Sequence, residues 1–341
     1  MEYKNVFLEG TGFHLPSEVL TSAEIEDRLA SCGERLGLVT GRLEKLTGIR
    51  ERRIWPSGTR PSAVSIKAAI KALEAANVSK DDINLVIHAG VCRDALEPAT
   101  ACVVHEGLGL DPSCIAFDVS NACVGFLNAL LIAANMIELG QINYALVVSG
   151  ENSGPIYPDT IQALLADQSA DALKNRLASL TLGSGAVAFV LASRKKAKTT
   201  HQLLGGAIQT DSRYYHVCEG QGNIFHQSMV TNTEEMLRQG LNLSKITWEI
   251  FKASLGWSNQ TPDFVFSHQV SRSHNTKALE TLGLSDKKSY FDFENLGNTG
   301  SVAVPLGLAM RVEQSLFKQG DKIALLGIGS GLSCVMLGVD W

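Results

Sequence analysis

The chain has 341 residues, of which 45% are hydrophobic and 19% charged, so it can build one large core or two packed halves without disulfides. Its formal net charge of -5 argues against general affinity for nucleic acid or anionic membranes. No apolar run reaches bilayer length, and the opening stretch MEYKNVFLEGTGFHLP lacks a signal-peptide pattern. We therefore expect a cytoplasmic protein with no stable membrane insertion.

Seven cysteines stand at irregular spacing along the chain. An odd number at such spacing is not a disulfide framework, and neither a C-x-x-C pair nor an H-E-x-x-H helix is present. We therefore expect reduced thiols, no metal site and no permanently bound cofactor.

In chain order, the predicted elements begin with a capping box, Thr21 with Glu24, ahead of a short helix. Amphipathic or apolar helices and nearly continuous apolar strands then alternate. They are a helix over 61–78, a strand over 83–91, a helix over 124–139, strands over 144–151 and 186–194, a helix over 233–256, and strands over 263–270 and 322–331. This alternation is typical of the α/β class.

A charged and polar stretch at 193–202 separates two parts in which the same kinds of element recur. We therefore expect two halves of similar kind. The N-terminal half covers 1–195 and carries a candidate nucleophile, and the C-terminal half covers 196–341 and carries candidate partners for it.

Cys123 is the candidate nucleophile, at the point where the segment DVSNA leads into the apolar helix 124–139. We expect that helix to be central and buried, and to end at Gly140. Unpaired N–H groups and the helix dipole stabilise a thiolate at a helix start, and a lowered pKa would make Cys123 a useful nucleophile. The alternative is a small buried side chain without chemistry.

Two polar residues of the second half stand at the ends of core elements. His268 ends a buried strand, where open α/β sheets place their ligands. Asn298 lies in a glycine-flanked turn before a helix, which can hold its amide against a ligand. Each residue alone is more often structural, as we expect of His274, but the joint occurrence of Cys123, His268 and Asn298 favours a site.

The stretches DVSNACVGF, HQVSRSH and GNTGSVAVP, in this order, resemble the thiolase superfamily and specifically its 3-oxoacyl-carrier-protein synthase III branch. LTGIRERR and GIGSGLSC strengthen this likeness, which covers essentially the whole chain. Within the branch, RDALEPATA, SHQVSRSH, IALLGIGSGLSC and the terminal Trp341 are similar to the OleA group, thiolases that join two fatty acyl chains head to head in olefin biosynthesis.

The resemblance implies a five-layered αβαβα fold built from two similar halves, and a homodimer formed through central strands. It implies that Cys123 is acylated, and that His268 and Asn298 polarise the thioester carbonyl or stabilise enolate charge. It also implies an oxyanion hole of backbone N–H groups, which we assign to Cys123, Ile328 and Gly329.

Every Claisen condensation needs a carbanion, made either by decarboxylating a malonyl thioester or by removing an α-proton from an acyl thioester. Glu97, just after a buried strand, offers a base for the second route. In decarboxylating relatives this position is typically apolar and enters the neighbouring subunit's pocket, whereas the OleA group carries Glu. A carboxylate in an apolar tunnel has a raised pKa, which suits a general base. The alternative is a loop carboxylate beside Arg93 and Asp94.

We therefore expect a non-decarboxylative Claisen condensation of two fatty acyl-CoA thioesters to a β-ketoacyl product, through an acyl group on Cys123 and with Glu97 of the partner subunit as the base. Acyl-carrier protein is an alternative acyl donor. Decarboxylative condensation with a malonyl thioester and acyl transfer to a heteroatom are the alternative reactions. A catalytically silent subunit is a different class, which the intact Cys123, His268 and Asn298 argue against.

The sequence departs from the synthase III pattern just before TGIRER, where an aromatic residue and an arginine normally grip the CoA adenine. Arg42 and Leu46 stand at those positions. We expect CoA contacts from nearby side chains instead, with a solvated basic face as the alternative. The candidates are Arg42, Arg50, Arg52, Arg53 and Trp55. The segment 155–180 is longer than a minimal synthase III needs, and we expect it to roof the acyl tunnel.

Overall fold

A long β-sheet runs through the computed structural model, which describes residues 1–290 and 292–341. Its strands are β1 (Val6–His14), β4 (Leu85–Ala89), β5 (Ile115–Val119), β6 (Tyr144–Glu151), β7 (Gly185–Ser193), β8 (Gln202–Thr210), β11 (Phe264–Ser267), β12 (Lys322–Gly329) and β13 (Ser333–Asp340). Within the described residues they are ordered β11-β12-β13-β8-β1-β7-β6-β4-β5. Two separate ribbons pair β2 (Glu18–Thr21) with β3 (Glu51–Ile54), and β9 (Cys218–Gly222) with β10 (Gln227–Thr231).

Helices cover the sheet and fill the space between its two parts. The longer ones are α4 (Pro61–Ala76), α5 (Thr100–Leu108), α6 (Gly125–Glu138), α7 (Ile156–Ala166), α9 (Thr233–Leu255), α10 (Arg272–Leu282) and α12 (Ala303–Glu313). The shorter ones are α1 (Ser22–Arg28), α2 (Gly33–Leu36), α3 (Arg42–Thr47), α8 (Ala170–Arg176) and α11 (Phe293–Leu296). In the described part of the chain, no helix combines the length and the apolar character needed to cross a membrane.

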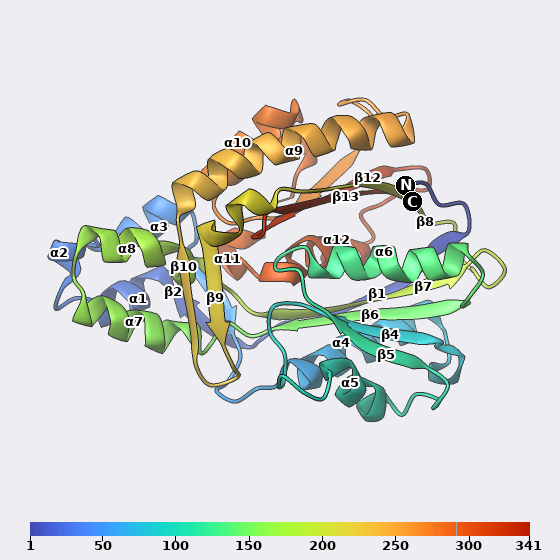
Figure 1. Ribbon diagram of the computed structural model, residues 1–341, viewed down its shortest axis with the longest axis horizontal. Coiled ribbons are helices and arrows are strands. Elements are labelled where there is room, and N and C mark those ends of the chain that lie inside the picture. Colours follow the sequence, from blue (N-terminus) through green and yellow to red (C-terminus); the bar gives the residue numbers. More distant parts are fainter. Residues whose placement is uncertain (291) are drawn as a thin grey trace.

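The sheet has two parts, which join where β1 pairs with β8 at Phe7 and Gln202. Strands β1 and β4–β7 form the first part, and β8 and β11–β13 form the second. In Figure 1, α4 and α5 cover the outer face of the first part, α9 and α10 that of the second, and α6 and α12 lie between the parts. The predicted five-layered αβαβα fold is confirmed. The division into 1–195 and 196–341 stays a prediction.

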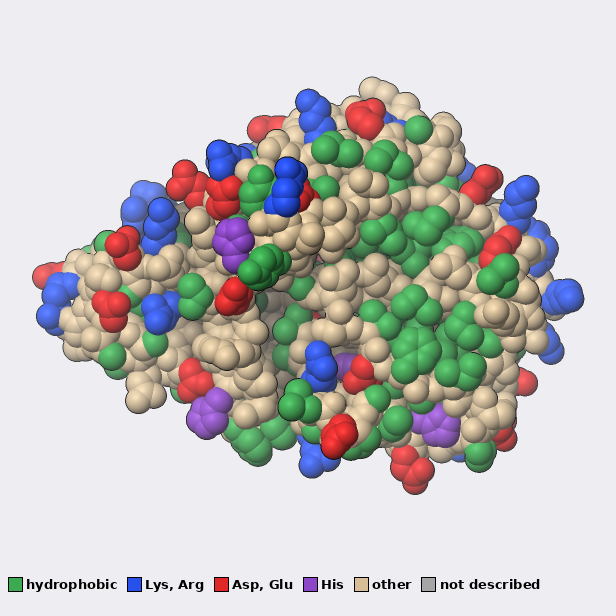
Figure 2. Space-filling model, viewed as in Figure 1, with side chains coloured by type: hydrophobic (Ala, Val, Ile, Leu, Met, Phe, Trp, Pro, Cys, Tyr) green, Lys and Arg blue, Asp and Glu red, His purple; other side chains and the backbone are tan. Residues whose placement is uncertain are grey.

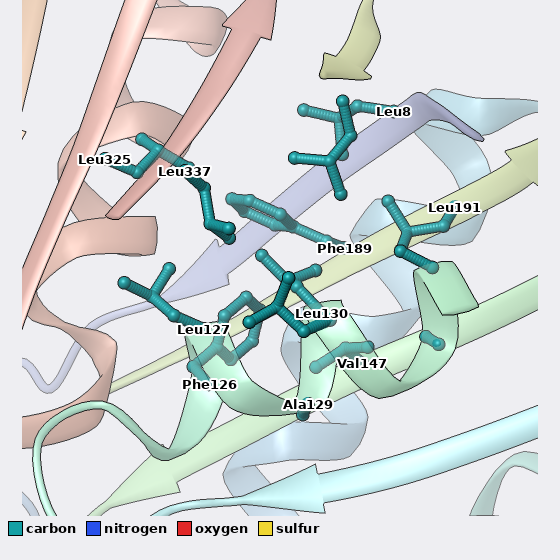
Figure 3. Close-up of a cluster of buried hydrophobic side chains, with 14 of the residues drawn as sticks. Leu8, Phe126, Leu127, Ala129, Leu130, Val147, Phe189, Leu191, Leu325 and Leu337 are labelled. Carbon is teal, nitrogen blue, oxygen red and sulfur yellow. The ribbon is translucent and has the colours of Figure 1, made fainter. Parts of the chain in front are cut away.

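The helix α6 is buried between the two sheet layers, as its apolar sequence predicts (Figure 3). Its side chains Phe126, Leu127 and Leu130 pack in one cluster with Phe189 of β7 and Leu337 of β13. The rings of Phe126 and Phe189 meet edge to face, with centroids 5.1 Å apart. Each such side chain stabilises the fold by about 1.5–3 kcal/mol when fully buried. The residues just before α6 are therefore attached to a rigid core helix.

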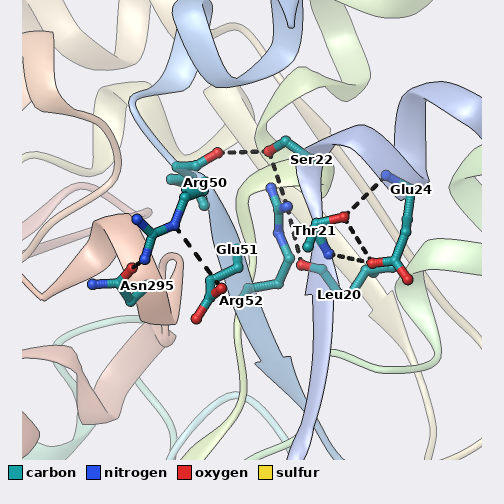
Figure 4. A network of polar contacts seen from close by, with 9 residues as sticks. Leu20, Thr21, Ser22, Glu24, Arg50, Glu51, Arg52 and Asn295 are labelled. Carbon is teal, nitrogen blue, oxygen red and sulfur yellow. Dashed lines mark hydrogen bonds and ion pairs between the residues drawn. The ribbon is translucent and has the colours of Figure 1, made fainter. Parts of the chain in front are cut away.

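The β2–β3 ribbon is fixed by two polar groups (Figure 4). The predicted capping box is confirmed, because Glu24 N–H donates to Thr21 Oγ1 at 3.1 Å and Thr21 N–H donates to Glu24 Oε2 at 2.7 Å. Arg52 of β3 is fully buried and donates to Ser22 Oγ at 3.0 Å and to the Leu180 carbonyl at 2.8 Å. A buried guanidinium needs such acceptors, so Arg52 ties the ribbon to the segment after α8.

Candidate active site

A cavity of about 910 Å³ lies before the N-terminal end of α6 and is lined by residues from both parts of the chain. Cys123, His268 and Asn298 all line it, and so does Ile328 near the end of β12. Figure 2 shows that this face of the molecule is hollowed near its middle. The structure therefore brings the three predicted side chains together in one space large enough for a sizeable ligand.

Cys123 lies in the turn between β5 and α6 and is half-buried. The residue before it, Ala122, has a φ of +45°, a left-handed conformation that costs a residue with a Cβ about 1–2 kcal/mol. This conformation turns the chain sharply and carries Cys123 into the cavity. Because α6 begins at Gly125 with Val124 as its N-cap, Cys123 precedes the helix and is not part of its first turn.

The expectation of a lowered pKa for Cys123 is wrong. Burial raises the pKa of its thiol to about 12, and the negative charge of Glu151 and the nearby Cys218 add to the rise. The helix dipole acts mainly within the first turn, which Cys123 does not reach. Cys123 is therefore a protonated thiol in the free protein, and its proton must move to another group when the sulfur attacks a substrate.

Gly329, at the end of β12, lies against the backbone of Cys123. A methyl group on Gly329 would lie 3.1 Å from the Cys123 nitrogen and 3.4 Å from the Val124 nitrogen. The absence of a side chain thus lets the end of the strand approach the backbone at the nucleophile. The assignment of an oxyanion hole to Cys123, Ile328 and Gly329 stays a prediction.

His268 follows β11, and its backbone N–H donates to the Leu326 carbonyl of β12 at 2.8 Å. Burial lowers the pKa of its imidazole to about 4, so the ring is neutral at physiological pH. Its Nδ1 is buried and has no hydrogen-bond partner among the described residues. A neutral imidazole accepts a proton at one nitrogen and donates from the other, so His268 can exchange a proton with a ligand.

Asn298 is held firmly by its own backbone. Its N–H donates to the Thr181 carbonyl at 2.8 Å, and its carbonyl accepts from the Gly183 N–H at 2.8 Å. Its side-chain oxygen accepts from the Gly300 N–H at 3.0 Å. Because this oxygen is occupied, the amide nitrogen is the end that remains for a ligand, and it can donate to developing negative charge.

Glu97 is exposed and does not line the cavity of its own chain, whereas Arg93, Asp94 and Leu96 of the same loop do. Leu96 is 93% exposed, which is exceptional for a leucine. Glu97 is therefore accessible from outside the cavity of its own subunit. The predicted action of Glu97 in the partner's site stays a prediction.

The predicted CoA contacts are only partly accessible. Trp55 is buried, and its indole N–H donates to the Glu151 carbonyl at 3.1 Å, so the prediction that it stacks on CoA is wrong. The prediction that Arg52 contacts CoA is wrong for the same reason, because its side chain is fully buried. Arg42 is exposed at the start of α3, and Arg53 is partly exposed. Their assignment to CoA stays a prediction.

Arg50 lines a separate cleft of about 740 Å³ between α3 and α10. Lys45, Arg272 and Lys277 line the same cleft, together with acidic side chains. Arg50 donates to Asn295 Oδ1 at 2.6 Å, and Arg272 is paired with Glu294. Of these cations, only Arg50 was singled out in the sequence, and Arg272 and Lys277 were missed because they come from a segment far away in the chain.

Glu151 was not predicted as a site residue, yet it is the buried carboxylate among the described residues that line the cavity. It accepts hydrogen bonds from the N–H groups of Val91 at 2.9 Å and Cys92 at 3.0 Å, and from the Ser301 hydroxyl at 2.6 Å. The signal was an acidic residue at the carboxyl end of the apolar strand 144–151, where open sheets place functional groups.

The walls of the cavity come mainly from the second half. The β9–β10 ribbon contributes polar and glycine residues, and one face of α9 contributes mostly apolar ones, including Leu237, Gly240 and Leu241. The expected roof, 155–180, contributes Ile156 and Ala178. The ribbon was not predicted, because its sequence CEGQGN lacks the apolar alternation of a strand.

Residues 117–212 match the family described as 3-Oxoacyl-[acyl-carrier-protein (ACP)] synthase III, and residues 253–341 match its C-terminal counterpart. The Acyl-CoA:acyl-CoA alkyltransferase of Shewanella oneidensis is 39% identical over 349 residues, and the match covers 100% of both chains. This chain belongs to the 3-oxoacyl-[acyl-carrier-protein] synthase III family. The prediction of that branch, and of a likeness to OleA, is therefore confirmed.

Solved structures of this synthase III family agree with the fold. A crystal structure of a Xanthomonas campestris OleA variant superimposes with a TM-score of 0.96 at 38% identity, and covers 100% of this chain and 98% of the other. Another, of Xanthomonas campestris OleA with bound lauric acid and lauroyl-CoA, has a TM-score of 0.94 at 38% identity over 99% and 100% of the two chains. The backbone that surrounds the cavity is thus common to these synthase III relatives.

Proposed function

We propose that this acyltransferase joins two fatty acyl-CoA thioesters by a non-decarboxylative Claisen condensation. The observation that carries the proposal is the single cavity onto which Cys123, His268 and Asn298 converge. A relative of 39% identity named Acyl-CoA:acyl-CoA alkyltransferase and an OleA structure with bound lauroyl-CoA support the choice of substrate.

The first step transfers an acyl group to the enzyme. Cys123 Sγ attacks the thioester carbonyl, the bond to the CoA sulfur breaks, and the thiol proton leaves through His268 to the departing CoA thiolate. The raised pKa of Cys123 makes such a proton acceptor necessary, and the neutral ring of His268 is ready to accept. The oxyanion lies toward the backbone of Cys123 and Gly329, where each N–H donor lowers the activation free energy by about 2.7–4 kcal/mol.

The second step forms the carbon–carbon bond. Glu97 of the partner subunit removes an α-proton from a second acyl-CoA, and His268 and Asn298 stabilise the enolate by hydrogen bonds to its oxygen. The enolate carbon attacks the acyl-Cys123 carbonyl, the sulfur–carbon bond breaks, and the Cys123 thiolate recovers the proton that Glu97 of the partner subunit had removed, which returns the carboxylate to its charged form. The product is a β-ketoacyl-CoA, which water can hydrolyse to a β-keto acid.

A second copy of the chain completes the proposed site. The strand β5 is an edge of the sheet, and Ile115 on it is 46% exposed. Figure 2 shows hydrophobic side chains gathered on this face over β5 and α6, where Phe117, Ile132 and Met136 are only partly buried. An exposed edge strand with an apolar surround favours pairing with a second copy. Such a dimer would supply the base that this chain does not direct into its own cavity.

Coenzyme A takes part in the proposed reaction only as the carrier of the acyl groups. We propose that Arg42, Arg50 and Arg53 contribute to holding its phosphates, together with Lys45 and Lys277, which line the same cleft as Arg50. Acyl-carrier protein is the alternative donor. The described cysteines are all free thiols, which supports our placement of the reaction in the cytoplasm.

The proposal is tested by incubating the protein with one long-chain acyl-CoA and measuring β-ketoacyl products and the intact mass of the protein. We expect condensed product without malonyl thioester, and an acyl adduct on Cys123. The Glu97→Gln variant should still form the acyl adduct on Cys123 but no condensed product. Glu219→Gln is the matched control, because Glu219 is an exposed carboxylate that lines the same cavity. Condensation that requires malonyl thioester would refute the proposal.

A further inference from the structure

Glu151 is a buried carboxylate that the proposed reaction does not use. It ends β6, is 4% exposed, and lines the cavity that contains Cys123. Among the described residues, no basic side chain forms an ion pair with it. Its carboxylate is instead stabilised by hydrogen-bond donors from two different segments. A buried carboxylate holds such donors tightly, because losing one of these hydrogen bonds would leave part of its charge unsatisfied and destabilise the fold.

The first segment is the start of the loop that carries Glu97. Glu151 Oε1 accepts from the Val91 N–H at 2.9 Å, and its Oε2 accepts from the Cys92 N–H at 3.0 Å. Gly90 makes this approach possible, since a methyl group there would lie 2.9 Å from Oε1. Glu151 therefore sets the direction in which the loop leaves the sheet.

A second anchor holds the same loop independently of Glu151. Asp94 accepts from the Ser62 N–H at 2.9 Å and from the Ser62 hydroxyl at 2.6 Å. The Asp94 N–H donates to Thr100 Oγ1 at 3.2 Å. The position of Glu97 thus depends on two anchors, one at Val91 and Cys92 and one at Asp94.

The other segment that Glu151 holds is the turn of Asn298. Glu151 Oε1 accepts from the Ser301 hydroxyl at 2.6 Å and from the Ser301 N–H at 3.3 Å. The neighbouring Gly300 N–H donates to the Asn298 side-chain oxygen at 3.0 Å, and this bond orients the amide. The carboxylate therefore also fixes the turn that aims Asn298 into the cavity.

We infer that Glu151 is a positioning residue for two active sites at once. Through Ser301 it orients Asn298 in its own subunit, and through Val91 and Cys92 it orients the loop that presents Glu97 to the other subunit. The inference rests on the proposed function, in which Glu97 acts across the dimer. Glu151 itself exchanges no proton and forms no bond with the substrate.

Mixed dimers separate the two roles. Two differently tagged chains are co-expressed, and one of them carries Cys123→Ala, so that each dimer has one working site whose base comes from the inactive chain. The reference dimer has no other change. Dimer A adds Glu151→Gln to the chain that keeps Cys123, and dimer B adds it to the Cys123→Ala chain.

We expect the condensation rate to fall at least about tenfold in both dimers, since a hydrogen bond to a charged group typically changes an equilibrium by that much. In dimer B the working site is intact except for the base that it receives. Acylation of Cys123 should therefore match the reference in dimer B while condensation falls, a split that misfolding would not produce. Condensation in dimer B at the reference rate would overturn the inference.

Ser62→Ala is the matched control variant, because it weakens the second anchor of the loop by removing the hydroxyl donor to Asp94 and leaves the turn of Asn298 unchanged. Placed in the Cys123→Ala chain it should slow condensation, and placed in the other chain it should have no effect. Equal effects in both chains would mean that the loop acts within its own subunit, against the inference.

One further dimer separates failure of the inference from failure of the proposed function. It combines Cys123→Ala in one chain with Glu97→Gln in the other, so that one site keeps both Cys123 and the base that reaches it. About half of the wild-type activity is expected, because one of two sites remains. An inactive dimer would refute the cross-dimer role of Glu97. An active one, together with an unaffected dimer B, would refute the inference alone.

Discussion

The Cβ position of Gly329 lies 3.1 Å from the backbone nitrogen of Cys123, which leaves no room for a side chain between the end of β12 and the nucleophile. We predict that Gly329→Ala lowers kcat about 100- to 1000-fold, the usual effect of losing an oxyanion donor. The free energy of unfolding should also fall, by about 1–3 kcal/mol, because the methyl group would press on the backbone nitrogens of Cys123 and Val124. Steady-state kinetics and denaturant unfolding measure the two effects, and wild-type kcat in the variant would contradict the assignment.

The raised pKa of Cys123 predicts its alkylation behaviour. Because the pKa is about 12, the rate of iodoacetamide labelling should rise with pH beyond 10 without reaching a plateau. Glu151→Gln removes one cause of the rise, so labelling at a fixed pH should become faster. Intact mass after timed labelling measures both rates. A plateau near pH 8.5 in the wild type would show an ordinary thiol.

The neutral His268 predicts how stability depends on pH. Its folded pKa, about 4, lies below the unfolded value near 6.5, so between these values the unfolded state binds more protons. This contribution to stability is fully present above about pH 6.5 and falls as the pH drops toward 4. Urea unfolding at pH 7 and pH 5 should therefore show a smaller loss in His268→Asn than in wild type. His216 is exposed, so His216→Asn is the control, and its free energy of unfolding should fall between pH 7 and pH 5 by as much as that of the wild type.

The wall formed by α9 predicts a substrate preference. A methyl group on Gly240 would lie 3.3 Å from Ile328 Cδ1, across the cavity lining. Gly240→Ala should shift the preferred acyl-CoA to shorter chains, and should also stabilise the helix by about 0.5–1 kcal/mol. Competition between acyl-CoA substrates of graded length tests the shift, and an unchanged preference would place the acyl chain elsewhere.

The burial of Trp55 predicts a structural role for it. Trp55→Phe removes the donor to the Glu151 carbonyl and should lower the free energy of unfolding by about 1–3 kcal/mol. The KM for acyl-CoA should stay at the wild-type value, whereas Arg50→Ala should raise it. A higher KM in Trp55→Phe would restore the interpretation of this residue as a CoA contact.

Much of the fold was predictable, because strands such as β6 and β7 are buried on both faces and their apolar runs are nearly continuous. The grouping of Cys123, His268 and Asn298 was also predictable, because all three stand at ends of core elements and the motifs around them resemble those of the synthase III family. The pKa of Cys123 was not, because it depends on burial and on Glu151, which a linear sequence does not bring near. The β9–β10 ribbon was missed since its residues have the composition of a loop.

The β2–β3 ribbon has a consequence for protein engineering. Buried Arg52 of β3 and Trp55 directly after it donate to carbonyls far away in the chain, Arg52 to Leu180 and Trp55 to Glu151. Both acceptors lie in segments that support the cavity. A chimera that exchanges residues 18–55 between relatives would therefore alter the hydrogen bonds that support the cavity wall. The segments around Leu180 and Glu151 would have to be exchanged as well to preserve them. The ribbon segment and the cavity wall that accepts its hydrogen bonds therefore have to be transferred together.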